Sequence, residues 1–197
     1  MDLQDLIKTR RMTRSFLSQP VEIDKVKQAL TLSYYAPSAG NTNGLYYIVL
    51  SNPQLIKRFW QITSDASWLQ SIQAKKLTAA PIIVIPAISP KAYQDRYKQE
   101  DKKRSKYYKV ALENWPVPYW YVDAGAALMI VLLTLEHFGL GALFFAIRNN
   151  YDNLLKELGI NPPDNELLLL GAIAIGYPQG LKAPKRHKRK PQILEAS

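Results

Sequence analysis

The 197-residue chain contains no cysteine and only two histidines. The absence of cysteine excludes disulfide bridges, thiolate metal sites and a cysteine nucleophile. Because His137 falls at an expected helix end and His187 in a basic tail, we expect no transition-metal site either. The longest apolar run, residues 124–135, is shorter than the about 20 residues of a membrane span, and residues 1–5 lack the pattern of a signal peptide. We therefore expect a cytoplasmic protein that does not bind membranes.

The motifs of side-chain catalysis are missing as well. The sequence holds no G-x-S-x-G turn, no P-loop and no H-E-x-x-H helix. No G-x-G-x-x-G follows an expected strand, which disfavours a dinucleotide-binding Rossmann unit. We therefore expect no catalytic side chain. If the protein is an enzyme, a bound organic cofactor carries its chemistry.

The net charge of +10 is confined to two short regions. Residues 91–109 contain eight Lys or Arg against three acidic residues, and residues 182–190 contain six Lys or Arg and no acid. The remaining twelve basic and thirteen acidic residues nearly cancel. Such charge runs are usually solvated surface. A nucleic-acid-binding module, recognisable by steeply salt-dependent binding, is therefore the weaker alternative.

The length of the chain and its 47% hydrophobic content are those of one domain with a buried core. Apolar spacing predicts helices near residues 3–7, 24–33, 53–60, 65–79, 90–112, 124–138 and 152–158, and strands near 46–50, 82–85, 143–147 and 167–175. The expected helix caps include Asp2, Asp24 and Asp123. The uneven alternation predicts α/β or α+β layers around one sheet. The helix near 124–138 is apolar nearly all round, so the core or another subunit must bury it.

Two stretches carry the strongest functional signal. Residues 36–41, Ala-Pro-Ser-Ala-Gly-Asn, combine a proline that fixes one backbone angle with a glycine that allows conformations closed to other residues. Such a loop can bring bare backbone groups against a flat polar ligand. About one helix upstream, Arg10, Arg11 and Arg14 can neutralise a phosphate. Together the two stretches indicate a nucleotide-like cofactor.

Four motifs, in this order, resemble the flavin-dependent nitroreductase family over essentially the whole chain. They are Arg10-Arg11-Met12-Thr13-Arg14-Ser15-Phe16 with Pro20-Val21, residues 36–43, Asp123-Ala124-Gly125-Ala126-Ala127 with Gly139-Leu140-Gly141, and Gly176-Tyr177-Pro178 with the basic tail. The resemblance implies a single α+β domain over residues 1–197, with a central mixed sheet flanked by helices. It also implies an intertwined homodimer with one FMN per subunit, held in a cleft between the two subunits.

The resemblance also implies which residues contact the cofactor and the acceptor. FMN would be held by Arg10, Arg11, Met12 and Arg14, by Ala146 and Ile147 near the flavin N5, by Lys188 or His187 with Arg189 in the basic tail at 182–197, and by Pro37, Ser38, Ala39 and Asn41 of the partner subunit. Residues 90–121 match the variable, lid-like region of the family. Within it, Trp115, Tyr119 and Trp120 can stack on a flat acceptor, or they can pack as ordinary core residues.

The implied activity is hydride transfer from NADH or NADPH, through the flavin N5, to a nitroaromatic, quinone or similar flat acceptor. Other flavin reactions on the same fold are the alternatives: reductive dehalogenation, flavin fragmentation or deazaflavin-linked chemistry. Three positions depart from the family's pattern, since Met12 replaces a serine, Asn43-Gly44 replaces Gln-Pro and His187 replaces a lysine. These departures leave open a weaker hold on FMN.

Overall fold

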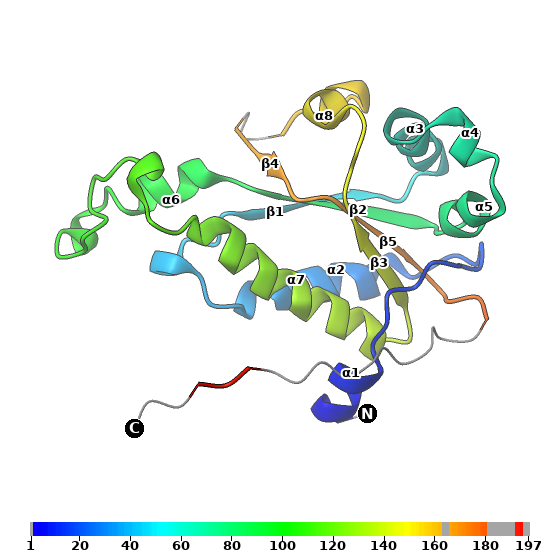
Figure 1. Ribbon diagram of the computed structural model, residues 1–197, viewed down its shortest axis with the longest axis horizontal. Helices are drawn as coiled ribbons and strands as arrows, with labels where there is room; N and C mark the ends of the chain where they lie inside the picture. The colour runs from blue at the N-terminus through cyan, green and yellow to red at the C-terminus, as the bar shows by residue number, and fades with distance from the viewer. Residues whose placement is uncertain (1, 163–165, 181–191, 195–197) are drawn as a thin grey trace.

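A five-stranded sheet separates two layers of helices (Figure 1). The computed structural model describes residues 2–162, 166–180 and 192–194. Four strands follow the order β1-β2-β5-β3, and a short fifth strand, β4, also pairs with β2. Their bounds are β1 Leu45–Leu50, β2 Ile82–Ile88, β3 Gly141–Phe145, β4 Leu168–Leu169 and β5 Ala172–Gly176.

Every pairing between these strands is antiparallel. Leu45 faces Ile88 across β1 and β2, and Gly141 faces Gly176 across β3 and β5. Within the described part of the chain, the parallel component of the sheet is one isolated bridge, between Met12 and Ala142. The expected α+β fold with a central sheet between helices is thus confirmed, and its mixed character is limited to that bridge.

The two central strands are apolar on both faces, as a doubly covered sheet requires. In β2, Ile82 and Val84 join the hydrophobic cluster under one face, whereas Ile83 and Ile85 join the cluster over the other. All four side chains are at most 2% exposed. This alternation with a period of two residues sets which face of the sheet each helix layer covers.

Different helices cover the two faces of the sheet. Below the sheet in Figure 1 lie α2 (Ile23–Leu32) and α7 (Tyr119–His137), which bury their apolar side chains against it. The opposite layer consists of α3 (Pro53–Thr63), α4 (Ala66–Leu69), α5 (Ile72–Thr78) and α8 (Leu154–Glu157). The remaining helices are α1 (Leu3–Thr9) and α6 (Pro90–Arg96), with short 3₁₀ turns at Ser33–Tyr35, Ala39–Asn41, Glu100–Lys102, Leu112–Asn114 and Tyr151–Asn153.

Helix α7 is the longest element and begins earlier than expected, at Tyr119. Asp123 therefore does not cap it, and its carboxylate is used elsewhere in the structure. By length and composition alone this helix could cross a membrane, a test that core helices also pass. Val131 and Leu135 are fully buried against the sheet side. On the other side, Val122 is 56% exposed, so the described residues leave one face of the helix uncovered there.

Two of the other expected caps can be compared with the structure. Asp2 is confirmed, because its carboxylate accepts a hydrogen bond of 2.9 Å from the Asp5 amide. Asp24 is not a cap, since α2 starts at Ile23 after Glu22, which makes no capping contact through its side chain. Glu22 instead accepts hydrogen bonds from Lys25 and from the Tyr177 hydroxyl. This long-range contact is invisible to a local pattern.

Three expected elements are shorter in the structure. The helix expected over 90–112 ends with α6 at Arg96, and the rest is turns, because the Lys- and Tyr-rich sequence offers no continuous apolar stripe. The helix expected over 65–79 is split into α4 and α5 by Ser71, whose hydroxyl caps α5. The strand expected over 167–175 is divided at Gly171, where φ is +127°.

We predict that Gly141→Ala destabilises the protein. A β-carbon at this position would lie 2.6 Å from the Thr13 Oγ1 and 2.9 Å from the Thr13 Cβ. Since the chain on both sides is fixed, we expect the free energy of unfolding to fall by about 1–3 kcal/mol in a denaturant titration. Adding Thr13→Ala removes the two nearest atoms and should restore part of the loss. An unchanged unfolding midpoint in the single variant would contradict the close approach.

Candidate cofactor site

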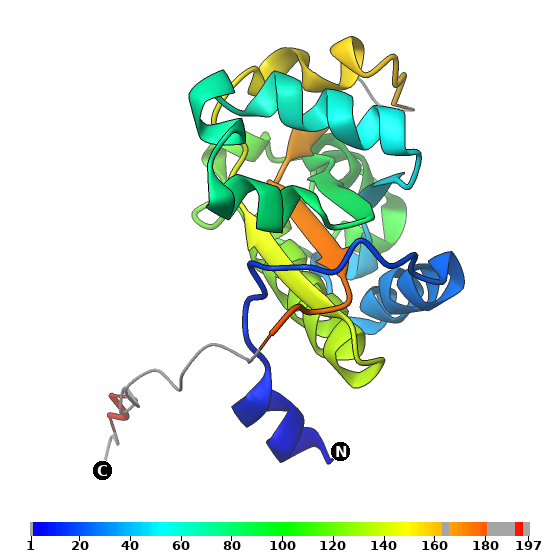
Figure 2. The ribbon, with the colours of Figure 1, turned by 90° about the vertical axis from the view of Figure 1, so that its right-hand side faces the viewer.

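The N-terminal segment, residues 10–16, is fixed to three distant parts of the fold. The Thr13 amide donates to the Ala142 carbonyl of β3 at 2.9 Å, and the Gln179 amide donates to the Ser15 carbonyl at 2.9 Å. The Phe16 amide donates to the Lys76 carbonyl near the end of α5 at 3.1 Å. Figure 2 shows this segment crossing the ends of β3 and β5. These contacts place residues 10–16, the arginine segment, beside α5 and the turn after α7.

A groove of about 640 Å³ opens beside this segment. Its walls come from the N-terminal segment, from α4 and α5, from the turn between α7 and β3, and from the chain after β5. The lining residues are Arg11, Met12, Thr13, Arg14, Ser15, Trp68, Gln73, Lys76, Leu77, Glu136, Gly139, Leu140, Gly141, Leu143, Pro178, Gln179 and Gly180. Three basic groups, two amides and the Glu136 carboxylate thus share the walls with apolar side chains, and the excess of positive charge suits a flat ligand with an anionic end.

The three arginines of this segment differ in what they contact. Arg11 donates to the carbonyls of Lys8 and Arg10, both at 2.8 Å, and so closes the end of α1. Arg14 is exposed and lines the groove. Arg10, next to the groove-lining residues, has its Nε and Nη1 atoms buried and without a hydrogen-bond partner. Within the described residues, none of the three forms an ion pair with an acidic side chain.

Gln73 and Lys76 line the same groove, and our sequence reasoning did not single them out. They lie three residues apart on α5 and therefore on one face of that helix. Both side chains are exposed. In the sequence, the only indication of a shared role was that an amide and an amine lie three residues apart on an expected helix. The contact between Phe16 and the end of α5 shows that this face of the helix lies beside the arginines.

Ala146 and Ile147 directly follow β3, which ends two residues earlier than expected, at Phe145. They line a second hollow of about 380 Å³, together with Trp60, Thr63, Asp65 and their neighbours. Trp68 and Leu77 line both this hollow and the groove. The two predicted positions therefore lie on the same side of the molecule as the arginine segment.

Residues 36–43 form a loop, the Asn41 loop, which lies in a different part of the fold from the groove. The Ala39 amide donates to Asp123, in the first half of α7, at 2.7 Å. The groove instead adjoins Glu136, near the end of the same helix. At 1.5 Å per residue the two positions are about 20 Å apart along α7. One chain thus holds the two groups of predicted FMN contacts apart.

The predicted acceptor-stacking residues belong to a packed aromatic cluster in the 90–121 excursion. Trp115 is 6% exposed and Trp120 is 9% exposed, and both pack with Tyr93. Tyr119 is half-buried, 6.0 Å between ring centroids from Tyr107. Within this chain, Trp115 and Trp120 therefore act as core residues with little free ring surface, in line with the packing alternative. The predicted contacts at Lys188 and Arg189 lie outside the described residues, as does His187.

The structure gives physical reasons for two departures from the family's pattern. Met12 packs against both hydrophobic clusters and bridges to Ala142 through its backbone. Asn43 has φ +49°, a left-handed conformation that asparagine adopts more readily than most residues. A β-carbon on Gly44 would lie 3.0 Å from the Tyr93 ring and 3.1 Å from the Ser89 carbonyl oxygen. The Asn-Gly pair thus fits a tight turn against α6.

Comparison with known proteins identifies relatives over nearly the whole chain. The sequence profile of the nitroreductase family matches residues 7–177. A proposed NADH dehydrogenase/NAD(P)H nitroreductase of Archaeoglobus fulgidus is 25% identical over 179 residues, which cover 90% of this chain and 86% of that protein.

Solved structures share the fold at low sequence identity. A proposed nitroreductase of Desulfovibrio desulfuricans, solved in complex with FMN, superposes with a TM-score of 0.70 at 19% identity, covering 98% of this chain and 99% of that one. Iodotyrosine deiodinase bound to FMN and 3-iodo-L-tyrosine gives a TM-score of 0.70 at 18% identity over the full length of both chains. An enone reductase of a gut-bacterial fatty acid pathway gives 0.72 at 20% identity, covering 94% and 93%.

Proposed function

This chain belongs to the nitroreductase family, and from that premise we propose that it is an FMN-dependent oxidoreductase. In this proposal, NADH or NADPH supplies a hydride, and a nitroaromatic, quinone or similar flat molecule accepts it. The membership makes the chain a flavoprotein of the oxidoreductase class. The cofactor, the hydride donor and the acceptor are the parts that the experiments below test.

The buried, unpartnered guanidinium nitrogens of Arg10 carry this proposal. Buried N–H donors without a hydrogen-bond partner are unfavourable unless a ligand supplies the acceptor, and a phosphate offers both acceptor oxygens and a negative charge. Arg14 and Lys76 add two more cations on the adjoining groove walls. The donor set therefore fits the phosphate and the polar ring edge of FMN.

The chemistry itself would belong to the flavin, which accepts a hydride and passes it on. The protein's residues would bind and orient the cofactor. Arg10 and Arg14 would hold the phosphate, with Arg11 beside them. Lys76 and Gln73 supply an ammonium and an amide on one wall, where they would stabilise negative charge on the ring. The backbone at Ala146 and Ile147 would face the flavin near N5.

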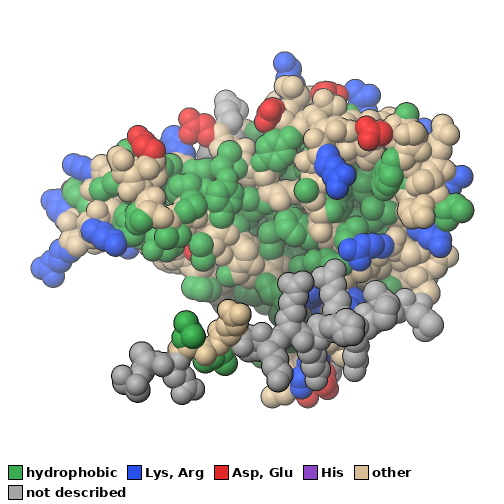
Figure 3. All heavy atoms as spheres, in the orientation of Figure 1, with side chains coloured by type: hydrophobic (Ala, Val, Ile, Leu, Met, Phe, Trp, Pro, Cys, Tyr) green, Lys and Arg blue, Asp and Glu red, His purple; other side chains and the backbone are tan. Residues whose placement is uncertain are grey.

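We further propose that the protein is a cytoplasmic homodimer. Apolar side chains gather across the middle of the face seen in Figure 3, whereas Lys and Arg side chains dominate the end of the excursion. The uncovered apolar residues include Leu3, Ile7, Tyr35, Tyr121, Val122 and Met129, each at least 38% exposed. Exposed apolar surface of this kind marks an interface. A second chain would cover α7 and bring its own Asn41 loop to the groove of the first.

The visible absorption spectrum of the purified protein tests this function most directly. We expect a yellow protein, or uptake of added FMN, and bleaching of the flavin band by NADH or NADPH in the absence of oxygen. A colourless protein that takes up no FMN would contradict the proposal. If the protein binds FMN but neither NADH nor NADPH bleaches the flavin band, the proposed cofactor is supported and the proposed hydride donor is contradicted. Profiling nitroaromatic, quinone and halogenated acceptors then separates reduction from the other reactions of this fold.

A further inference from the structure

The Asn41 loop is held in an uncommon backbone conformation. Gly40, Asn41 and Asn43 have φ angles of +67°, +56° and +49°. For residues other than glycine, such left-handed angles cost energy and persist only where surrounding contacts impose them. Hydrogen bonds within the loop supply some of these contacts, among them the Thr42 hydroxyl donating to the Ala39 carbonyl at 2.6 Å. The rest come from the excursion and from α7.

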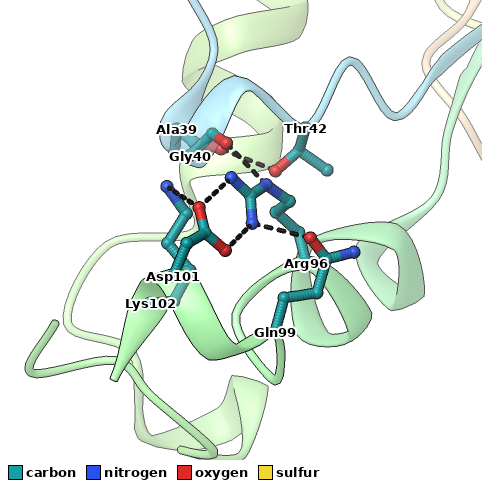
Figure 4. A network of polar contacts seen from close by, with 7 residues as sticks. All are labelled: Ala39, Gly40, Thr42, Arg96, Gln99, Asp101 and Lys102. Atoms are coloured by element: carbon teal, nitrogen blue, oxygen red, sulfur yellow. Dashed lines mark hydrogen bonds and ion pairs between the residues drawn. The ribbon is translucent and has the colours of Figure 1, made fainter. Parts of the chain in front are cut away.

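Arg96, at the end of α6, fixes the loop from the excursion side (Figure 4). Its Nε donates to the Gly40 carbonyl at 2.9 Å. Its Nη1 and Nη2 donate to the two Asp101 carboxylate oxygens at 2.7 and 2.6 Å, and Nη1 also donates to Gln99 at 2.8 Å. The guanidinium lowers the pKa of Asp101 to about 2, so the pair stays charged at neutral pH. This two-pronged contact holds the guanidinium in one orientation.

Asp123 fixes the loop from the other side. Its carboxylate accepts hydrogen bonds from the Ala39 amide at 2.7 Å and from the Tyr93 hydroxyl at 2.9 Å. The Tyr93 side chain is 1% exposed, so this anchor is part of the core. Gly40 itself lies against Tyr97, because a β-carbon there would come within 2.8 Å of the ring. The backbone of the loop is thus held against the core by Asp123 and Tyr97.

The outer edge of the loop is free by comparison. Pro37, Asn41 and Asn43 are exposed, whereas Gly44 is buried beneath them. Arg96 and Asp123 bind backbone groups of the loop and leave these outer side chains uncovered. The arrangement is typical of a rigid surface that is prepared before a ligand arrives, which lowers the entropy lost on binding.

We propose that Arg96 is a positioning residue for the cofactor: locked by Asp101, it holds the Asn41 loop in the conformation that meets the flavin of the partner subunit. This inference rests on the proposed function. In this proposal Arg96 acts through the backbone of the Asn41 loop and does not itself contact the flavin. We call the contacts of Arg96 with Gly40, Gln99 and Asp101 the latch. Because Gln99 and Asp101 belong to the 90–121 excursion, the latch also couples the excursion to the Asn41 loop.

Arg96→Ala tests the latch, with Lys103→Ala as the matched control. Lys103 also forms an ion pair on this turn, but its partner is Glu100 and not a residue of the Asn41 loop. Amide hydrogen exchange over residues 39–43 should accelerate about tenfold in Arg96→Ala and stay unchanged in Lys103→Ala. The dissociation constant for FMN should rise about tenfold, the loss expected for a charge-assisted hydrogen bond. Bound flavin in the variant should also differ in fluorescence, which a purely structural role would not alter.

A second variant, Asp101→Asn, guards against misfolding of the first. It keeps Arg96 but removes the charge of its exposed partner, and it should give the same changes at a smaller size. Unchanged exchange in a folded Arg96→Ala protein would overturn the latch, as would accelerated exchange with unaltered FMN affinity. Failure of the wild-type protein to take up FMN would overturn the proposed function instead, and the latch toward flavin with it.

Discussion

An Arg10→Ala variant is expected to lose its FMN while the apoprotein remains folded. Two nitrogens of this guanidinium are buried without a partner, so in the free chain their N–H groups lack the hydrogen bonds that water would supply. Removing these unsatisfied donors relieves the cost of their burial. The thermal midpoint of the apoprotein should therefore stay the same or rise.

Binding should change in the opposite direction. The contact between a guanidinium and a phosphate is charge-assisted, and its loss costs about 3 kcal/mol, which weakens binding about a hundredfold. Titration of apoprotein with FMN, followed by flavin fluorescence, measures this change. The upward shift of the thermal midpoint that FMN gives the wild-type protein should disappear in the variant at the same ligand concentration.

Arg11→Ala is the informative comparison for this experiment. Arg11 donates to two carbonyls at the end of α1, so its loss should loosen that helix and affect FMN much less. Wild-type affinity in Arg10→Ala would refute the phosphate role of Arg10. Equal losses in both variants would show that the segment as a whole, rather than the unpartnered guanidinium, determines binding.

Mixed dimers should recover a cofactor site that neither parent variant has. One chain carries Arg10→Ala and the other carries Gly40→Val. In the second chain the new side chain would meet Tyr97 and would require φ +67°, which displaces the Asn41 loop. If every site combines the arginine segment of one chain with the loop of the other, a mixed dimer has one intact site and one site with both defects.

Purification through two different tags isolates the mixed dimer. We expect about one FMN per mixed dimer and almost none in either variant homodimer, because a symmetric dimer has two equivalent sites that the mutations distribute unequally. A mixed dimer with no FMN would indicate that both groups of contacts come from the same chain. That outcome would conflict with their separation along α7 in the structure.

Local sequence patterns predicted those elements whose stability is largely local. Pro53 opens α3 after Asn52, whose side chain caps the first turn, and Asp2 caps α1. The β-branched run in β2 forms a fully buried strand. Prediction was wrong where the partner of a side chain is remote. Asp123 has the composition of a cap, yet it binds the backbone of a loop more than eighty residues earlier in the chain.

The candidate site divides in the same way. Arg10, Arg14 and the Asn41 loop were recognisable because their residue types and order are unusual in a local window. Gln73 and Lys76 were missed because an amide and an amine on a helix are ordinary until another segment is known to lie beside them. For Trp115 and Trp120 the sequence allowed both stacking on an acceptor and packing in a core, and the tertiary structure buries both side chains within the chain.

The sequence by itself determined the resemblance to the family, the absence of thiol chemistry, and the residues from which a phosphate site can be built. These properties depend on residue identity and order along the chain. Only the tertiary structure decided that the Asn41 loop and the arginine segment lie at opposite ends of α7, and that Arg96 and Asp123 hold the loop from beneath. Those facts depend on which distant segments pack together, and packing is set by the whole core rather than by any local pattern.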